Sequence, residues 1–218
     1  MKIFSKALVA LLLLINATSS LAYFLWYKPK FNSHPATHNF SFNKKSDNST
    51  TILRLKQKVS AAATFAKANN YNTNLCFLID MKIASGLKRF FVYDLEKDSV
   101  EMAGLVAHGS GSDKGGDDLC FSNTPNSNCT ALGKYKIGKS YIGKFGLAYK
   151  LYGLDNTNNK AFKRFIVLHA HPCVPNDDVV PVPICESWGC PTVAPAFLNA
   201  IKNYIDRSKR PVLLWIYY

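Results

Sequence analysis

A cysteine and a histidine near the end of the sequence have the types and spacing of a nucleophile and its base. Cys190 lies in "CESWGCP", and His169 ends the apolar run "RFIVLH", 21 residues earlier. A cysteine attacks as the thiolate, so it needs a base or a positive field beside it and partial exposure. Gly189 permits a tight turn that would present Cys190 and direct backbone N–H groups at a developing oxyanion. This pattern indicates nucleophilic chemistry by a thiol.

The other cysteines suit disulfides, because the chain carries six and an even number is typical of exported proteins. Six cysteines allow 15 connectivities, so the count leaves the pairing open. We expect the local pairs Cys120–Cys129 and Cys173–Cys185, each of which closes a short loop rich in Pro, Asn or Asp. Cys76 lies in the apolar run "NLCFLIDM" and is expected to be a buried, inert thiol.

The first residues have the pattern of a secretory signal. Two lysines precede an apolar run, and small residues end at Ala22 where a signal peptidase would cleave. We therefore expect residues 1–22 to be a signal peptide, residues 23–49 a linker or flexible arm, and residues 50–218 a single domain. The alternative is an uncleaved anchor that continues through "YFLWY", and membrane contact is expected only in that case.

The chain is strongly basic, with a formal charge of +13 that falls to +11 once the two lysines of the signal segment are removed. A charge of this size favours nucleic acid, anionic lipid or an acidic cell-wall polymer as partner. Export makes nucleic acid the least expected of the three, so no nucleic-acid partner is predicted. The lysines are scattered along the chain, and a solubilising surface is an equally good interpretation of them.

The elements that must position these residues are mainly strands. A helix is expected to begin at Thr50 or Thr51 and to end near "NNYN". After Asn74 the sequence changes to short β-type runs separated by turn signals, from "LCFLID" to "PVLLWIYY". One helix, "APAFLNAIKNYIDRSK", interrupts them late and places Phe197 and Ile201 on one face. The predicted fold class is therefore mainly β, of the α+β type.

Several sequence blocks together resemble a known family. "FIVLHAHP" followed by "ESWGCPTVAP" is similar to the signature of the murein L,D-transpeptidase catalytic domain, the YkuD-like cysteine enzymes, in the branch with a Ser-Trp-Gly-Cys-Pro motif. "VAHGSGS" and "FSNTPNSNCTALGKYKIGKSYIGKFGLAYKLYGLD" resemble the same branch in the same order, so the resemblance covers about Leu75 to Tyr218. It implies a β-sandwich or mixed-sheet fold with an N-terminal helix and one late helix.

The resemblance implies acyl transfer on peptidoglycan stem peptides. Cys190 would attack the L,D bond before the terminal D-alanine of a tetrapeptide stem and form a thioester, and His169 would take the thiol proton. The N–H groups of Gly189 and Cys190 would stabilise the oxyanion. An amine acceptor would give a crosslink, whereas water would make the enzyme an L,D-carboxypeptidase. No cofactor is implied, and we expect a monomer in the periplasm or cell envelope.

Other candidates surround this pair. Ser187 would bond within the active-site turn or act as an ordinary turn residue. Trp188 would stack on substrate or pack in the core beside the loop, and packing is the favoured prediction. His171 lies one strand step beyond the base, on the same face. His108 ends a strand in "VAHGSGS", where an exposed loop histidine is the main alternative to a site role. A substrate carboxylate would be bound by Arg164, Lys163 or Lys134.

Where many family members carry a histidine two places before the nucleophile and a basic or amide residue two places after it, this sequence has Trp188 and Thr192. That departure fits the Trp branch and leaves the substrate contacts open.

Two alternatives of other classes remain. The histidines and cysteines of this region are residue types that bind zinc, although their spacing is irregular for a structural site. The zinc ligands would come from His169, His171, Cys173, Cys185 and Cys190. The second alternative is a non-catalytic domain that binds the cell wall through its basic surface.

Overall fold

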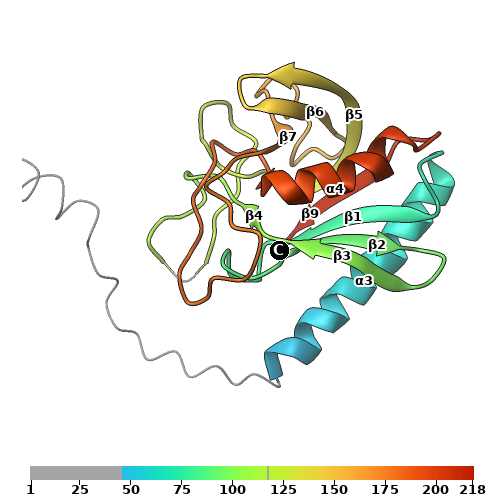
Figure 1. The fold of residues 1–218 in the computed structure, drawn as a ribbon, viewed down its shortest axis with the longest axis horizontal. Helices are drawn as coiled ribbons and strands as arrows, with labels where there is room; N and C mark the ends of the chain where they lie inside the picture. The colour runs from blue at the N-terminus through green and yellow to red at the C-terminus, as the bar shows by residue number, and fades with distance from the viewer. Residues whose placement is uncertain (1–45, 117) are drawn as a thin grey trace, which may run out of the picture. The chain divides into compact units, whose positions relative to one another are not determined.

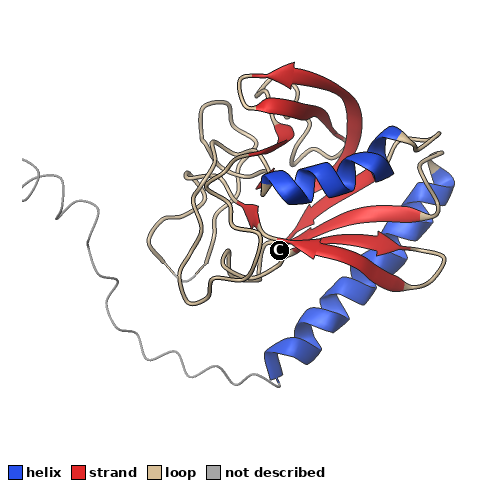
Figure 2. Cartoon of the chain, in the orientation of Figure 1, coloured by secondary structure: helices blue, strands red, loops and turns tan. Residues whose placement is uncertain are grey.

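The computed structural model describes residues 46–116 and 118–218 (Figure 1). Nine strands and two helices make up this part of the chain (Figure 2). The predicted signal peptide lies outside the described residues, as does most of the predicted arm. The elements, in chain order, are α3 (Ser46–Ala68), β1 (Leu75–Asp80), β2 (Phe90–Asp94), β3 (Ser99–Gly104), β4 (Val106–Ala107), β5 (Gly133–Gly143), β6 (Gly146–Gly153), β7 (Val167–Ala170), β8 (Thr192–Val193), α4 (Pro195–Asp206) and β9 (Leu213–Tyr217).

All nine strands belong to one sheet, in the order β3-β2-β1-β9-β5-β6-β7-β8-β4. The pairs β1–β9 and β7–β8 are parallel and the others are antiparallel. The sheet curls into a nearly closed, barrel-like form, with β5 and β6 bending over one end (Figure 1). This order brings the late strands β7 and β8 next to each other, with β4 at the edge.

The helix α3 covers one face of the sheet. Its buried side chains fall at helical spacing and pack against every second residue of β1, because successive strand residues point to opposite faces. Cys76 and Leu78 face α3, whereas Phe77 and Ile79 face the other way, into the main core. The buried residues of α3 in this cluster are Leu55, Val59, Ala62 and Ala66.

The helix α4 covers the opposite face (Figure 1). Its buried residues are Phe197, Leu198 and Ile201. The ring of Phe197 lies edge-on to Phe90 of β2, with 5.2 Å between the centroids. The predicted apolar face of this helix is therefore confirmed at Phe197 and Ile201, and burying such side chains contributes about 1.5–3 kcal/mol each.

The predicted fold class is confirmed: the domain is mainly β, with an N-terminal helix and one late helix. The first helix begins at Ser46, before the expected Thr50 or Thr51. The predicted hairpin around "DLEKDSVEM" is confirmed by the antiparallel pair β2–β3. In residues 46–116 and 118–218, no helix combines the length and apolarity that a membrane crossing needs.

Candidate active site

Cys190 and His169, the two residues predicted to carry the chemistry, line one cavity of about 530 Å³ at the ends of β7 and β8. Cys190 and His169 belong to its wall, together with Ser187, Trp188 and Thr192 from the segment around the nucleophile. The β5–β6 turn contributes Tyr141, Lys144 and Phe145, and the segment before β7 contributes Lys163, Arg164 and Phe165.

Cys190 carries a free thiol that is held by backbone groups. Its Sγ accepts a hydrogen bond from the Val167 N–H at 3.5 Å and donates to the Phe165 carbonyl at 3.8 Å. Burial raises the pKa of the thiol, while the Val167 N–H and the positive charge of Arg164 oppose this rise. The resting group is therefore a thiol at neutral pH and needs a base to attack.

His169 carries a buried imidazole. It is 6% exposed, and burial is the main cause that lowers its pKa below 6.5. Its Nδ1 lies 3.1 Å from the Ala170 carbonyl oxygen and its Nε2 lies 2.9 Å from Oγ1 of Thr192. Because a carbonyl only accepts, Nδ1 carries the proton, and Nε2 has its lone pair toward the Thr192 hydroxyl.

The pairing of β7 with β8 explains this contact. His169 and Thr192 are partners in the parallel register, so their side chains emerge side by side on the cavity face. The Thr192 hydroxyl also lies 3.4 Å from the Cys190 carbonyl oxygen. The sequence analysis treated Thr192 as a departure from the family pattern and missed this role. The available signal was a β-branched hydroxyl residue two positions after Cys190.

The turn that carries the nucleophile is fixed by Ser187 and Gly189. Ser187 Oγ donates to the Cys190 carbonyl at 2.7 Å and accepts from the Gly189 N–H at 3.1 Å. Gly189 has φ of +104°, and a Cβ there would lie 2.7 Å from the Cys129 carbonyl oxygen. The turn therefore requires glycine, as expected. The Gly189 N–H, however, is occupied by Ser187 and does not serve as an oxyanion donor in this structure, which leaves the Cys190 N–H as the candidate.

The three cations proposed for a substrate carboxylate differ in position. Arg164 lines the cavity, but its guanidinium is tied to a loop through Ser122 O at 2.8 Å and Cys129 O at 2.7 Å. Its role is to fix that loop and to place a positive field near the thiol. Lys163 lines the cavity and makes no ion pair within the described chain. Lys134 pairs with Asp155 at 2.8 Å and does not line this cavity.

Exposed aromatic side chains form part of the cavity wall. Trp188 is 74% exposed, so the prediction that it packs in the core is wrong. Phe165 is 84% exposed and also lines the cavity. Phe145, which the sequence analysis missed, stacks on the ring of His169 with 4.9 Å between centroids and meets His171 edge-on at 5.7 Å. These rings offer stacking surfaces to a ligand.

The other two histidines of residues 46–116 and 118–218 occupy different environments. His171 lines the cavity, and its Nδ1 accepts from the Cys173 N–H at 3.2 Å, which leaves Nε2 for other contacts. His108 is 6% exposed, so it is not an exposed loop histidine. Burial is the main cause that lowers the pKa of His108 to about 4, with the nearby charge of Arg89 as the second cause.

The cysteine pairing is confirmed in part. Cys173 and Cys185 form a disulfide, as expected. The expected bond between Cys120 and Cys129 is wrong, because both are free thiols that donate to the same carbonyl oxygen, that of Gly111. Cys76 is buried, and burial raises the pKa of its thiol to about 12, which makes it inert. The disulfide also removes two of the five ligands of the zinc alternative.

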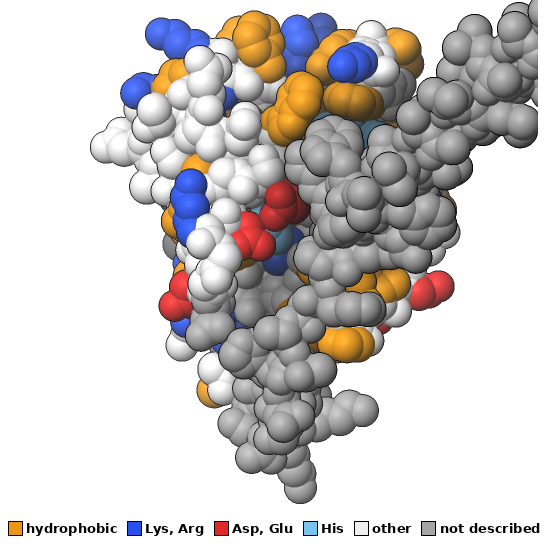
Figure 3. All heavy atoms as spheres, turned by 90° about the vertical axis from the view of Figure 1, so that its left-hand side faces the viewer, with side chains coloured by type: hydrophobic (Ala, Val, Ile, Leu, Met, Phe, Trp, Pro, Cys, Tyr) orange, Lys and Arg blue, Asp and Glu red, His pale blue; other side chains and the backbone are white. Residues whose placement is uncertain are grey.

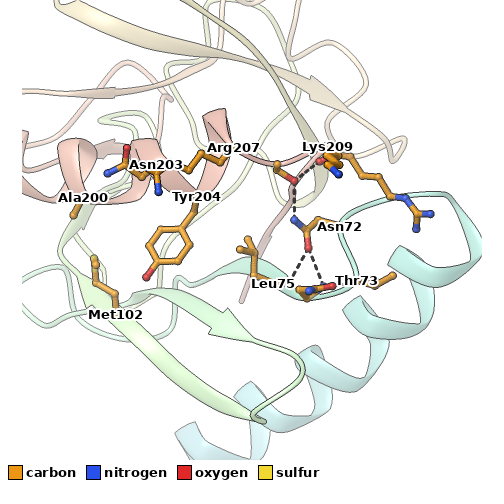
Figure 4. Close-up of a pocket in the computed structure, with 12 residues that line it drawn as sticks. Asn72, Thr73, Leu75, Met102, Ala200, Asn203, Tyr204, Arg207 and Lys209 are labelled. Carbon is orange, nitrogen blue, oxygen red and sulfur yellow. Dashed lines mark hydrogen bonds between the residues drawn. The ribbon is translucent and has the colours of Figure 1, made fainter.

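A larger hollow of about 950 Å³ lies elsewhere, where α4 meets the start of β1. Figure 4 shows Tyr204 of α4 and Arg207, which follows this helix, on one side of the hollow, and Asn72 and Leu75 among the residues that line it. The hollow contains none of the predicted site residues. The cavity that holds Cys190 is therefore the candidate active site, even though it is the smaller one.

Comparison with protein families decides the assignment. The model of the L,D-transpeptidase catalytic domain matches residues 44–217. The chain belongs to the L,D-transpeptidase catalytic domain family. The match includes both Cys190 and His169, so the resemblance read from the sequence is confirmed. A search of curated proteins gives no match.

Among solved structures, the domain is similar at 15% identity to an L,D-transpeptidase from Xylanimonas cellulosilytica, with a TM-score of 0.34 and coverage of 71% of this chain and 68% of that one. An L,D-transpeptidase from Mycobacterium tuberculosis is 12% identical, with a TM-score of 0.34 and coverage of 66% and 58%. A fused Zn-dependent amidase/peptidase/peptidoglycan-binding domain-containing protein from Clostridium acetobutylicum is 15% identical, with a TM-score of 0.37 and coverage of 72% and 59%.

Proposed function

We propose that this L,D-transpeptidase domain is an exported cysteine acyltransferase that acts on the tetrapeptide stems of peptidoglycan in the periplasm or cell envelope. The observation that carries the proposal is a free thiol, Cys190, in one cavity with a buried neutral imidazole, His169. The signal-like N-terminus supports export.

In the proposed acylation, Sγ of Cys190 attacks the carbonyl carbon before the terminal D-alanine. The C–S bond forms, the C–N bond breaks, and the thiol proton reaches the leaving amine through His169. Nε2 of His169 meets the Thr192 hydroxyl at rest. Transfer therefore requires this hydroxyl to turn away from Nε2 or to carry the proton between the two groups.

Charged and aromatic groups of the cavity suit such a stem. Lys163 and Lys144 line the wall and offer countercharges to its carboxylates. The Lys144 ammonium lies over the rings of Phe145 and Trp188, at 5.5 and 6.0 Å from their centroids. These cations are partly exposed, so we expect their attraction for the stem to weaken as salt is raised.

Hydrolysis and crosslinking share the same thioester, so L,D-carboxypeptidase activity is the second candidate. Incubation of the mature protein with tetrapeptide-stem muropeptides tests the proposal, with Cys190→Ala as the matched control. We expect the wild type alone to release D-alanine. Product masses then separate a crosslinked dimer from a trimmed stem, and equal release by both proteins would disprove the assignment.

A further inference from the structure

A second cluster of titratable side chains lies at the edge of the same cavity. His108, Asp113 and Glu186 place one nitrogen or oxygen atom each within 4.8 Å of one another. Glu186 also lines the cavity of Cys190, and its side chain is 36% exposed. Figure 3 shows acidic side chains next to a histidine on this face of the molecule. The mechanism above uses none of the three.

The backbone holds Glu186 next to His108. The Ser187 N–H donates to the His108 carbonyl at 2.8 Å, and the Ser110 N–H donates to the Ser187 carbonyl at 2.8 Å. Gly109 and Ser187 form a parallel bridge. The segment before the nucleophile is therefore paired with the segment after β4, and the position of Glu186 is fixed relative to Cys190 by the same turn.

A buried arginine determines the tautomer of His108. Arg89 is 1% exposed, and its Nε and Nη2 donate to the Val106 carbonyl at 3.0 and 2.8 Å. Its Nη2 also lies 3.0 Å from Nδ1 of His108. Because arginine only donates, Nδ1 accepts and Nε2 carries the hydrogen. That Nε2 is buried, has no hydrogen-bond partner in the described chain, and lies 3.5 Å from Oε1 of Glu186.

This tautomer argues against a metal ion in the cluster. A metal would require the lone pair of His108 at Nε2, and the hydrogen would then sit on Nδ1 and face the Arg89 donor. The cluster instead places an N–H donor 3.5 Å from Oε1 of Glu186, together with two carboxylates whose other lone pairs are open. The negative charges of the two carboxylates exceed the single positive charge of the Arg89 guanidinium, because His108 is neutral and adds no charge. A cation that donates hydrogen bonds, such as an ammonium group, fits these groups.

We propose that Glu186, which lies 3.5 Å from Nε2 of His108 and is accompanied by Asp113, forms a subsite that binds the ammonium group of an amine acceptor. This inference rests on the proposed function. It assigns Lys144 and Lys163 of the cavity wall to stem carboxylates and Glu186, at the edge of the same cavity, to the incoming amine. It favours crosslinking, or capture of another primary amine, over hydrolysis.

In the second half-reaction, deacylation of the thioester by the amine, every bond and proton is accounted for. The bound ammonium gives up one proton to solvent through Glu186, and the free amine attacks the thioester carbonyl. The C–N bond forms, the C–S bond breaks, and the Cys190 sulfur leaves with the second amine proton, returned through His169. No oxidant or other co-reactant is needed. The proposal concerns deacylation only, so the first half-reaction should not depend on Glu186.

Glu186→Gln tests the subsite, because it keeps the shape of the side chain and removes its charge. The thioester is formed with a tetrapeptide stem and mixed with n-propylamine, which is charged at neutral pH, or with methoxyamine, which is not. We expect Glu186→Gln to lower the rate constant for n-propylamine about tenfold, because the ammonium group loses a hydrogen bond to a charged carboxylate. The rate constant for methoxyamine should stay within about twofold.

Glu101→Gln on β3 is the matched control, because Glu101 pairs with Lys97 and does not line the cavity. It should leave both rate constants unchanged. If Glu186→Gln forms the thioester at the normal rate and treats both amines as the wild type does, the subsite is disproved and the proposed function stands. If the wild type forms no thioester, the proposed function fails first and the subsite with it.

Discussion

The hydroxyl of Thr192 lies 2.9 Å from Nε2 of His169, across the parallel pair of β7 and β8. The Ala170 carbonyl, which only accepts, defines the tautomer of the imidazole, with its proton on Nδ1 and the lone pair of Nε2 toward the Thr192 hydroxyl. The contact with Thr192 also means that the basic nitrogen is already engaged when the thiol is at rest. The orientation of the imidazole therefore depends on the pairing of β7 with β8, which brings together two residues that are 23 positions apart in the sequence.

Thr192→Val should slow acylation. The substitution keeps the shape of a side chain that is 3% exposed and removes only the hydroxyl. Loss of one hydrogen bond of about 0.5–1.5 kcal/mol corresponds to a roughly 2- to 10-fold lower single-turnover rate of D-alanine release. Thr64→Val on the exposed face of α3, where the hydroxyl bonds to Ser60 O at 3.0 Å, is the control and should not change the rate. A faster or unchanged rate in Thr192→Val would show that the hydroxyl does not orient the base.

Gly189→Ala should distort the nucleophile turn. A methyl group at φ of +104° would lie 2.7 Å from a backbone oxygen that cannot move freely. Strain of this kind costs about 1–3 kcal/mol, so we expect a lower urea midpoint and a large loss of acylation. Gly116→Ala is the control, because a Cβ there meets no atom within 4 Å of the described chain. A variant at Gly189 with normal stability and activity would contradict the assigned geometry.

Stability should fall between pH 7 and pH 5 because His108 is buried in its neutral form. Its pKa is lowered from 6.5 to about 4, so in this range the unfolded chain binds a proton that the folded chain does not. The free energy of unfolding therefore rises with pH across this window. As the pH falls from 7 to 5, His108 lowers it by at most about 2 kcal/mol. Urea unfolding at both pH values measures it. His108→Gln, which cannot be protonated, should show a smaller change, and an equal change would exclude His108 as its source.

Much of the fold and part of the site could be predicted because they depend on local pattern. Short β-type runs separated by turn signals located the strands, and the helical spacing of Phe197 and Ile201 located the face of α4 that is buried. The disulfide between Cys173 and Cys185 followed from a short loop. Cys190 and His169 were recognised from their residue types, and the cavity brings them together.

The rest depends on contacts between segments that are distant in sequence. The hydrogen bond between Thr192 and His169 needs the β7–β8 register. The placement of Glu186 next to His108, whose Nδ1 faces Arg89, brings together residues from three separate stretches of chain. Trp188 was expected inside because aromatic residues usually bury their area, but the turn that exposes Cys190 also directs this ring outward.

The central claim is that Cys190 becomes acylated by a tetrapeptide stem with loss of D-alanine. Intact-mass measurement of the protein after brief mixing with the stem, followed by peptide mapping, tests it most directly. We predict a mass increase equal to the acyl group, located on the peptide that contains Cys190, absent in Cys190→Ala and removed by hydroxylamine. A protein that consumes the stem without any adduct on Cys190, or that carries the same adduct in Cys190→Ala, would contradict the account.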